Sequence, residues 1–410
     1  MADLSVKSFG MINPFVVASS PATQGALNVL KTAASMPGAI VLRNFGHGAG
    51  GGGYINPDIE SMLKGNASHS HAAGRPVSDG INSLEQYCEV VKEIKQKMSK
   101  EIKLWVSIGH NSDIAKGGDW DKYWVKQANE LSLAGADAFE LHFNTPGVAA
   151  VGNRNFDYYQ LVYYSTKLIK EAAKNIPVMT KLAVEGCDPL IAIQRASDAG
   201  ADAVGPTARW KAFTFDLDWR RSQANPGGGY GGTQANPIVC YVVAEARSKG
   251  IKTPMYAGGG VFSFDNALRI AMAGSELIQL GALACSGGIG ACKKLFSDFN
   301  KWMDANGYAN MKELTGDALK LFNIPRELAG ERIKRIGDAY QKTPLDKNLC
   351  NGCGRCYDVC WHDSIVIDQK KANKKDSCIG CGYCYQVCPT GALKVDAGGI
   401  LASVFKDAGI

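Results

Sequence analysis

The sequence lacks the features of membrane, secreted and nucleic-acid-binding proteins. No apolar run approaches the ~20 residues that a transmembrane helix needs. Residues 1–13 have neither the charged start and apolar core nor the small-residue cleavage site of a signal peptide. The net charge of +6 is slight for 410 residues, and the lysines within 370–375 are typical of a solvated loop. We therefore expect a cytoplasmic protein that binds no membrane and no nucleic acid.

A disulfide scaffold is not expected either. A secreted disulfide-stabilised domain would be short and rich in cysteine throughout. Here eight of the 13 cysteines fall between Cys350 and Cys388, and five are scattered along the rest of the chain. The scattered five are expected to be small buried hydrophobic residues: Cys88, Cys187, Cys240, Cys285 and Cys292.

The eight clustered cysteines form two runs with the spacing C-x2-C-x2-C-x3-C. Three thiolates so spaced ligate one [4Fe–4S] cluster, and the fourth, on the helix that follows, ligates the other cluster. Zinc sites are disfavoured, because they pair two C-x2-C knuckles or add histidines and do not need this repeated spacing. The sequence therefore predicts two clusters that transfer electrons. Their expected ligands are Cys350, Cys353, Cys356 and Cys388 for one, and Cys378, Cys381, Cys384 and Cys360 for the other.

Upstream of these runs, short apolar segments alternate with longer helical stretches, as in a parallel sheet built from βα units. Eight segments are strand candidates, near residues 15, 40, 104, 138, 178, 203, 255 and 277. Eight such strands predict an α/β fold, a (β/α)8 TIM barrel, over residues 1–299. A doubly wound sheet is the alternative, disfavoured because no G-x-G-x-x-G follows the first strand. We expect a helical connector over 300–344, then a small α+β two-[4Fe–4S] ferredoxin-like domain and tail over 345–410.

Two glycine-rich segments follow the last two expected strands, at residues 257–261 and 279–283. Chemistry in TIM barrels lies on the loops after the strands, and glycine-rich backbone there exposes N–H groups to a phosphate. A plain turn would explain one such loop, but two at this position indicate a phosphorylated cofactor.

The chain resembles the FMN barrel of dihydroorotate dehydrogenases. The resemblance rests on residues 13–15 and 19–21, the strand that carries Lys181, residues 229–232, and the two phosphate loops. With the two-cluster segment, the whole is similar to the iron–sulfur subunit of bacterial NAD-dependent dihydropyrimidine dehydrogenases. The resemblance implies that Lys181 lies at the pyrimidine edge of FMN, where a cation stabilises the anionic reduced flavin. It also implies that seven further residues contact FMN. Ser20, Gly231 and Gly232 would contact the flavin, and the phosphate would be held by Gly259, Gly260, Gly281 and Ala282.

The sequence departs from this family at the proton donor. In the family a cysteine or serine before a proline exchanges the substrate proton, and the matching residue here is Thr145. Threonine alone is a poor acid and would need a relay or a water. The family's asparagine on the preceding strand is His142 here, and histidine titrates near neutrality, so it is the other candidate. A turn residue at 145 and an interior histidine at 142 are the structural alternatives.

Substrate recognition is expected to differ as well. Arg43 stands where relatives carry lysine, and Arg209 lies where an Asn-Thr pair recognises the pyrimidine ring. Arginines in a pocket suit a carboxylate or another anion. With Asn144, they predict a small polar, anionic cyclic substrate rather than uracil or thymine. The glycine-rich run at 47–53 is expected to be a mobile loop near the same mouth, either a lid or a plain excursion.

Together these features predict an FMN- and iron–sulfur-dependent oxidoreductase that acts on a C=C or C=N double bond. Since the chain has no dinucleotide fingerprint, NAD(P)H would be oxidised by a separate flavoprotein subunit, or a ferredoxin would be the electron partner. The resemblance implies a homodimer or hetero-oligomer. The alternatives are a non-catalytic electron-transfer subunit, favoured by Thr145, and a true dihydropyrimidine dehydrogenase.

Overall fold

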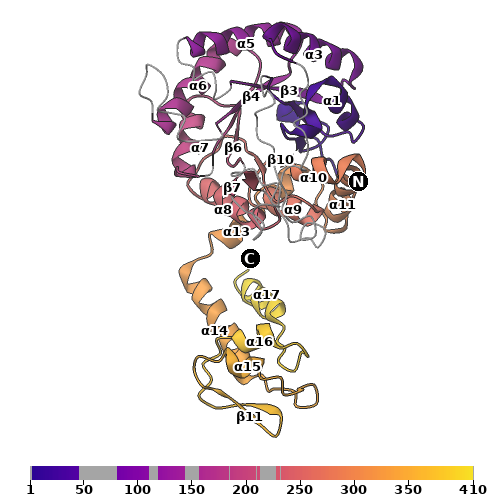
Figure 1. Ribbon diagram of the computed structural model, residues 1–410. Coiled ribbons are helices and arrows are strands. Elements are labelled where there is room, and N and C mark those ends of the chain that lie inside the picture. The colour runs from indigo at the N-terminus through magenta and orange to yellow at the C-terminus, as the bar shows by residue number, and fades with distance from the viewer. Residues whose placement is uncertain are drawn as a thin grey trace, which may run out of the picture. The chain divides into compact units, whose positions relative to one another are not determined.

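A computed structural model describes residues 2–45, 81–109, 119–143, 157–183, 185–208, 210–212, 228–230 and 232–409. The chain divides into two compact units, Met1–Leu319 and Lys320–Ile410 (Figure 1). This division falls inside the connector expected at 300–344. No described helix has the length and apolar composition of a membrane span.

The first unit is built on eight parallel strands. They are β1 (Phe15–Val17), β2 (Ala39–Leu42), β3 (Lys103–Ile108), β4 (Ala138–His142), β5 (Val178–Lys181), β6 (Ala203–Gly205), β9 (Tyr256–Gly258) and β10 (Leu277–Leu280). Their order in the sheet is β6-β5-β4-β3-β2-β1-β10-β9. The two end strands meet through a parallel bridge between Val204 and Met255, where the Val204 amide donates to the carbonyl of Pro254 at 2.8 Å. The eight predicted strands and the TIM barrel are confirmed.

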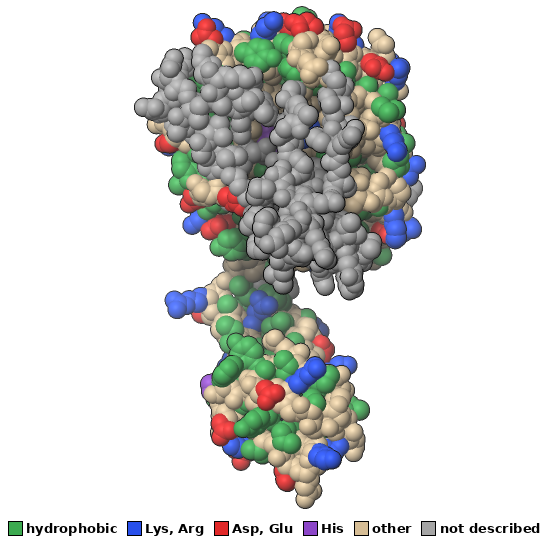
Figure 2. Space-filling view, in the orientation of Figure 1, with side chains coloured by type: hydrophobic (Ala, Val, Ile, Leu, Met, Phe, Trp, Pro, Cys, Tyr) green, Lys and Arg blue, Asp and Glu red, His purple; other side chains and the backbone are tan. Residues whose placement is uncertain are grey.

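Helices follow the strands and cover the outside of the sheet (Figure 1). They are α1 (Gly25–Ala33), α3 (Leu84–Lys97), α5 (Trp120–Ala134), α6 (Tyr158–Ala173), α7 (Pro189–Asp198), α8 (Ala235–Ser248), α9 (Phe264–Met272), α10 (Ala282–Ser286) and α11 (Gly288–Ala305). Shorter elements are the 3-10 helices η1 (Lys7–Phe9) and η2 (Pro21–Thr23), the antiparallel pair β7 (Trp210–Ala212) and β8 (Gly228–Tyr230), α12 (Met311–Leu314) and α13 (Leu319–Phe322). On the face shown in Figure 2, the acidic and basic side chains at the rim of this unit are interspersed.

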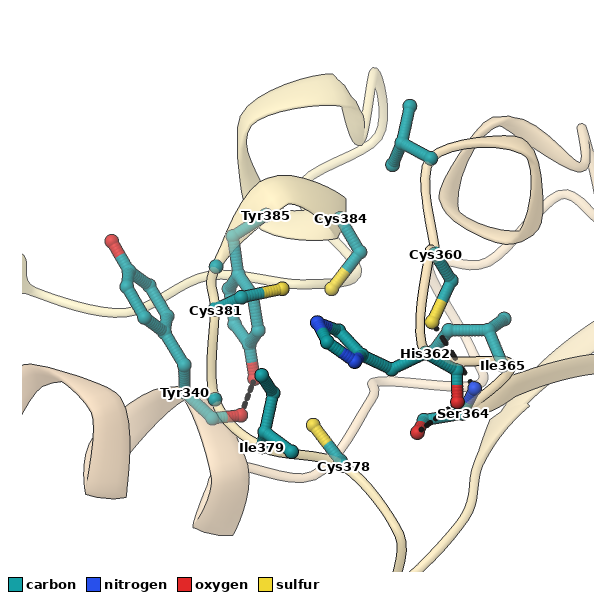
Figure 3. A pocket seen from close by; sticks show the side chains of 13 residues that line it. Tyr340, Cys360, His362, Ser364, Ile365, Cys378, Ile379, Cys381, Cys384 and Tyr385 are labelled. Atoms are coloured by element: carbon teal, nitrogen blue, oxygen red, sulfur yellow. Dashed lines mark hydrogen bonds between the residues drawn. The ribbon is translucent and has the colours of Figure 1, made fainter.

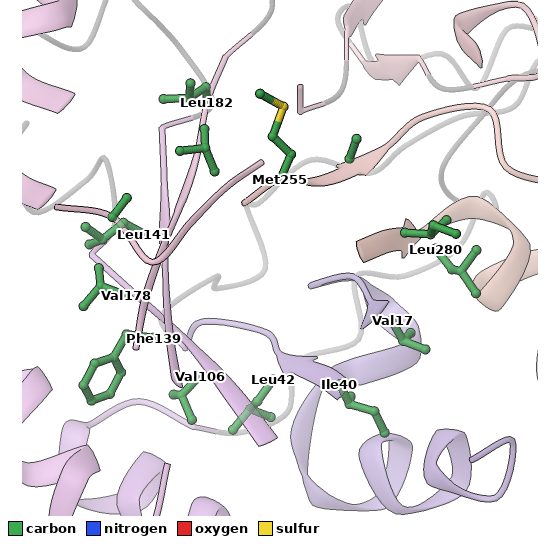
Figure 4. Close-up of a cluster of buried hydrophobic side chains, with 14 of the residues drawn as sticks. Val17, Ile40, Leu42, Val106, Phe139, Leu141, Val178, Leu182, Met255 and Leu280 are labelled. Carbon is green, nitrogen blue, oxygen red and sulfur yellow. The ribbon is translucent and has the colours of Figure 1, made fainter. Parts of the chain in front are cut away.

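Strand alternation divides the buried side chains between two cores. In β2, Ile40 and Leu42 belong to the larger core, which also contains residues of the covering helices (Figure 4). Val41 belongs to a smaller cluster together with Trp105 and Tyr256, which come from β3 and β9. Because successive side chains of a strand point to opposite faces, a strand buried on both faces is apolar almost throughout. This explains why the strands appear in the sequence as continuous apolar runs.

Three of the helix–strand junctions are closed by the same acidic clamp. Asp137, before β4, accepts hydrogen bonds from the amide of Leu104 in β3 and from Lys95 in α3, both at 2.7 Å. The other two clamps join Asp202 to Val178 and Lys170, and Glu276 to Met255 and Arg247. In each clamp, the carboxylate before one strand accepts a hydrogen bond from an amide at the start of the neighbouring strand. It also binds a charged side chain of the helix that precedes that neighbouring strand, so the clamp links one helix to two strands.

The second unit is small. It contains α14 (Arg326–Lys342), α15 (Arg355–Asp358), β11 (Ile365–Asp368), β12 (Lys371–Lys374), α16 (Tyr383–Val387) and α17 (Ala397–Asp407), and β11 and β12 form an antiparallel pair. Four aliphatic residues and three cysteines make up its buried core: Ile365, Ala372, Ala392, Leu393, Cys350, Cys356 and Cys384. So small an apolar core is typical of domains that gain stability from bound metal.

Candidate active site and cluster-binding sites

The loops after β9, β10 and β1 lie side by side at the carboxyl end of the barrel. Gly258 at the end of β9 is in register with Gln279, and Leu280 at the end of β10 is in register with Val17. The amide of Ala18 continues this pairing by donating to the carbonyl of Leu280 at 2.8 Å. The two expected phosphate loops and the segment with Ser20 therefore leave the barrel from three neighbouring strands.

The glycines of these loops have different surroundings. At Gly260, where φ is +68°, an added Cβ would lie 2.4 Å from the carbonyl oxygen of Gly232 and 2.8 Å from the amide nitrogen of Asn236. Its loop is thus packed directly against the start of α8. At Gly281 an added Cβ would meet, among the described residues, only the Cβ of Ala18, at 3.9 Å, so these residues leave open space beside the backbone. This is the arrangement in which a ligand can approach main-chain N–H groups closely.

Ser20 adds a hydroxyl to the same end of the barrel. Its side chain is buried, and its Oγ has no hydrogen-bond partner among the described residues. The main chain around it is fixed, because its amide donates to the Thr23 hydroxyl at 3.0 Å. A buried hydroxyl without a partner costs about 1–3 kcal/mol, a cost that a bound polar ligand removes. The hydroxyl and the open backbone at Gly281 both fit a phosphorylated flavin.

Two strand ends place a cation and an imidazole next to each other. His142 ends β4 and is in register with Lys181, which ends β5 and is 7% exposed. Behind them lies Glu140, which is fully buried and accepts a hydrogen bond from Nε2 of Gln279 at 3.1 Å. Burial raises the pKa of Glu140 above its usual value, and the Lys181 ammonium opposes this rise. The interior of the barrel thus places a buried carboxyl group close enough to Lys181 for the two charges to interact.

In the second unit, the cysteines line two cavities. One has about 350 Å³ of free space, part of it open to solvent, and is lined by Cys360, Cys378, Cys381 and Cys384, which point into it together with His362 (Figure 3). The other has about 320 Å³ of free space, also partly open to solvent, and is lined by Cys350, Cys353, Cys356 and Cys388. The structure therefore groups the cysteines as the sequence motif pairs them, three from one run with the fourth from the other.

Hydrogen bonds and charge around the sulfurs fit cluster ligands. The amide of Ser364 donates to Sγ of Cys360 at 3.2 Å, and the amide of Ala372 donates to Sγ of Cys350 at 3.4 Å. Amides that donate to sulfur favour thiolate ligands and orient them. Burial, and then the neighbouring Cys378 and Cys381 sulfurs, raises the pKa of Cys384 to about 11. Bound iron would compensate the repulsion between such crowded thiolates, so metal loading would stabilise this fold.

Comparison with protein families identifies both units. A model described as dihydroorotate dehydrogenase matches residues 1–303, and a model described as 4Fe-4S dicluster domain matches residues 343–395. The chain belongs to the dihydroorotate dehydrogenase family. Proteins of this family are flavin-dependent oxidoreductases that act on CH–CH groups, and here the barrel is joined to an iron–sulfur domain.

Individual relatives match either about half of the chain or nearly all of it. The NAD-dependent dihydropyrimidine dehydrogenase subunit PreA of Escherichia coli K12 is 22% identical over 377 residues, which are 88% of this chain and 85% of PreA. The catalytic subunit of dihydroorotate dehydrogenase B (NAD(+)) of Pyrococcus abyssi is 28% identical over 187 residues, 45% of this chain. Dihydroorotate dehydrogenase A (fumarate) of Limosilactobacillus reuteri is 28% identical over 202 residues, 49% of this chain. The matches span 62% and 65% of the lengths of these last two relatives.

Several residues expected at the active site of this dihydroorotate dehydrogenase-like barrel lie outside the described residues: Asn144, Thr145, Arg209, Gly231 and the run at 47–53. Arg43 is described and directly follows β2, where its guanidinium donates to Oε1 of Gln24 at 3.0 Å. Trp210, the neighbour of Arg209, stands near Gly259, since a Cβ added there would be 3.5 Å from the indole.

The interior of this dihydroorotate dehydrogenase-like barrel contains buried polar side chains from three strands, Glu140, Tyr256 and Gln279, which the sequence did not predict. Tyr256 from β9 is fully buried near Glu140, and burial and the Glu140 charge raise its pKa well above the usual value. Its hydroxyl and Oε1 of Glu140 have no partner in good hydrogen-bond geometry among the described residues. One signal was available, because a glutamate and a glutamine within fully apolar strands are rare unless they are paired.

Proposed function

We propose that this protein is an FMN- and [4Fe–4S]-dependent oxidoreductase that adds hydrogen to, or removes it from, a C=C or C=N bond of a small polar, anionic cyclic compound. One observation carries the proposal. The carboxyl ends of the barrel strands bring together the buried Lys181, the Ser20 hydroxyl and the backbone at Gly281, and the described residues leave that hydroxyl without a partner and that backbone open. The same chain carries two cavities that are each lined by four cysteines.

The barrel residues would bind and polarise the cofactor. The backbone N–H groups of Gly259, Gly260, Gly281 and Ala282 would hold its phosphate, and Gly231, Gly232 and Ser20 would contact the flavin. Lys181 would place its positive charge at the pyrimidine edge. Bound FMN supplies hydride chemistry and converts between two-electron and one-electron transfer, which the clusters alone cannot do.

The proton would come from the end of β4. His142 is in register with Lys181, so its imidazole belongs to the strand end beside the proposed flavin edge. We assign the proton donor to His142, with Thr145 as the second candidate. Arg43, Asn144 and Arg209 would bind the substrate, and the two arginines favour a carboxylate on it.

The electron partner is proposed to be a separate flavoprotein subunit that oxidises NAD(P)H, with a ferredoxin as the second candidate. Two similarities support this, because PreA is named as a subunit and the Pyrococcus abyssi protein as a catalytic subunit of an NAD(+)-dependent enzyme. The two proposed clusters, held by the ligand sets that line the two cavities, would pass electrons between this partner and FMN. A homodimer or hetero-oligomer is expected.

Reoxidation of the reduced protein tests this function. The purified protein is photoreduced without oxygen until its flavin absorbance is bleached, and unsaturated cyclic acids and neutral pyrimidines are then added one at a time. We expect at least one cyclic acid, such as orotate, to restore the flavin absorbance faster than uracil or thymine. If no compound restores it, the non-catalytic electron-transfer subunit becomes the better account. Faster reoxidation by uracil would instead identify a dihydropyrimidine dehydrogenase.

A further inference from the structure

The two cysteine cavities differ at one equivalent position. Each run continues after its fourth cysteine into a turn with one residue in the left-handed region, Asp363 (φ 47°) after Cys360 and Gly391 (φ 71°) after Cys388. The residue two positions after the cysteine lines the cavity in both cases, and it is His362 in one and Thr390 in the other. The pseudo-equivalent loops therefore present different groups to their cavities.

His362 reaches into its cavity. Its imidazole extends between Cys381 and Cys384 on one side and Cys360 and Cys378 on the other (Figure 3). The residue as a whole is exposed, so solvent also reaches it. Thr390 has a shorter side chain, with its hydroxyl 3.7 Å from Sγ of Cys388.

The loop that carries His362 is held in place by hydrogen bonds. The hydroxyl of Ser364 donates to the carbonyl of His362 at 3.1 Å and lies 3.0 Å from the hydroxyl of Ser377. The amide of Ser364 donates to Sγ of Cys360 at 3.2 Å. That amide favours Cys360 as the thiolate ligand, so His362 is not needed as a fourth ligand and its N–H group is available to sulfur.

We propose that His362 donates a hydrogen bond to the cluster held by Cys360, Cys378, Cys381 and Cys384 and raises its reduction potential. The proposal rests on the cluster ligation proposed above. Reduction adds negative charge to a cluster, and an N–H donor to its sulfurs stabilises that charge. His362 would thereby favour reduction of the cluster in this cavity.

Redox titration monitored by electron paramagnetic resonance tests the proposal on the purified, cluster-loaded protein. His362→Leu keeps apolar cover over the cavity but removes the N–H donor. We expect about a tenfold lower ratio of reduced to oxidised cluster at a given potential, which equals about 59 mV for a one-electron couple. His362→Gln retains a donor and should show a smaller decrease. Thr390→Val is the matched control, and it should leave this cluster unchanged.

Two results would overturn this inference without affecting the proposed function. Unshifted potentials in His362→Leu, with iron content intact, would show that the imidazole does not tune the cluster. Loss of about four irons per chain in both His362 variants would make the residue a ligand instead of a donor. A wild-type protein without cluster signals would overturn the proposed function as well, so the two failures are distinguishable.

Discussion

Replacing Gly281 with alanine separates cofactor binding from folding. Among the residues that the structure describes, the added Cβ would make one ordinary contact, 3.9 Å from the Cβ of Ala18, and the φ of −110° is not in the left-handed region. Because Gly281 is the N-cap of α10 and alanine is a poorer N-cap than glycine, we expect the apoprotein to lose about 1 kcal/mol of stability at most. The methyl group would, however, occupy the open space through which a phosphate approaches the backbone N–H groups. Losing one hydrogen bond to a charged group costs about 1.5–3 kcal/mol, which corresponds to an FMN affinity about 10- to 150-fold weaker.

The assay is titration of apoprotein with FMN, followed by quenching of flavin fluorescence, with thermal unfolding measured in parallel. Gly260→Ala is the matched control. Its φ of +68° would cost about 1–2 kcal/mol in a residue other than glycine, and its Cβ would lie 2.4 Å from the carbonyl oxygen of Gly232. This variant should lose stability even without FMN. An unchanged FMN affinity in Gly281→Ala would refute the proposed phosphate site, and so would a loss of apoprotein stability as large as that in Gly260→Ala.

Other variants test the remaining parts of the site. Cys356→Ala should lower the iron content by about four per chain while leaving FMN bound, and unchanged iron would contradict the ligand assignment. Lys181→Met should slow flavin reduction more than it weakens flavin binding, measured by stopped-flow absorbance; an unaltered rate would remove its role. His142→Asn should abolish a near-neutral pKa in the turnover profile, and a retained pKa would leave the histidine structural. Burial raises the pKa of Cys240 and Cys292 to about 11, so the thiolate fraction falls and both should resist iodoacetamide at pH 8, checked by mass spectrometry.

The barrel strands and the cluster segment could be predicted because their signals are local. A strand such as β2 is buried on both faces and appears as a short apolar run, and the helix before β4 ends at Gly135, where φ is +103°. The cysteine spacing likewise depends on a single turn and the helix after it. These features need no knowledge of the tertiary structure, so composition and spacing were sufficient.

The grouping of polar side chains in the barrel interior could not be predicted, because these residues come together only when the sheet closes into a barrel. Glu140 lies on β4, far in the sequence from Tyr256 on β9 and Gln279 on the neighbouring β10, and it meets them only across the barrel interior. The acidic clamps have the same origin, since Asp137 reaches Leu104 across 33 positions of the chain. Strand periodicity identifies such residues as buried but does not show which of them meet. The position of His362 was missed for a related reason, because the cavity that it enters is formed by both cysteine runs.

In the proposed function, one chain binds both a flavin and two clusters and passes electrons between them. Anaerobic reductive titration of the purified protein, with absorbance and electron paramagnetic resonance recorded together, tests it most directly. We predict an uptake of about four electrons per chain, two in the flavin and one in each cluster. Uptake of only two electrons, with either the flavin or the cluster signals missing, would contradict the account.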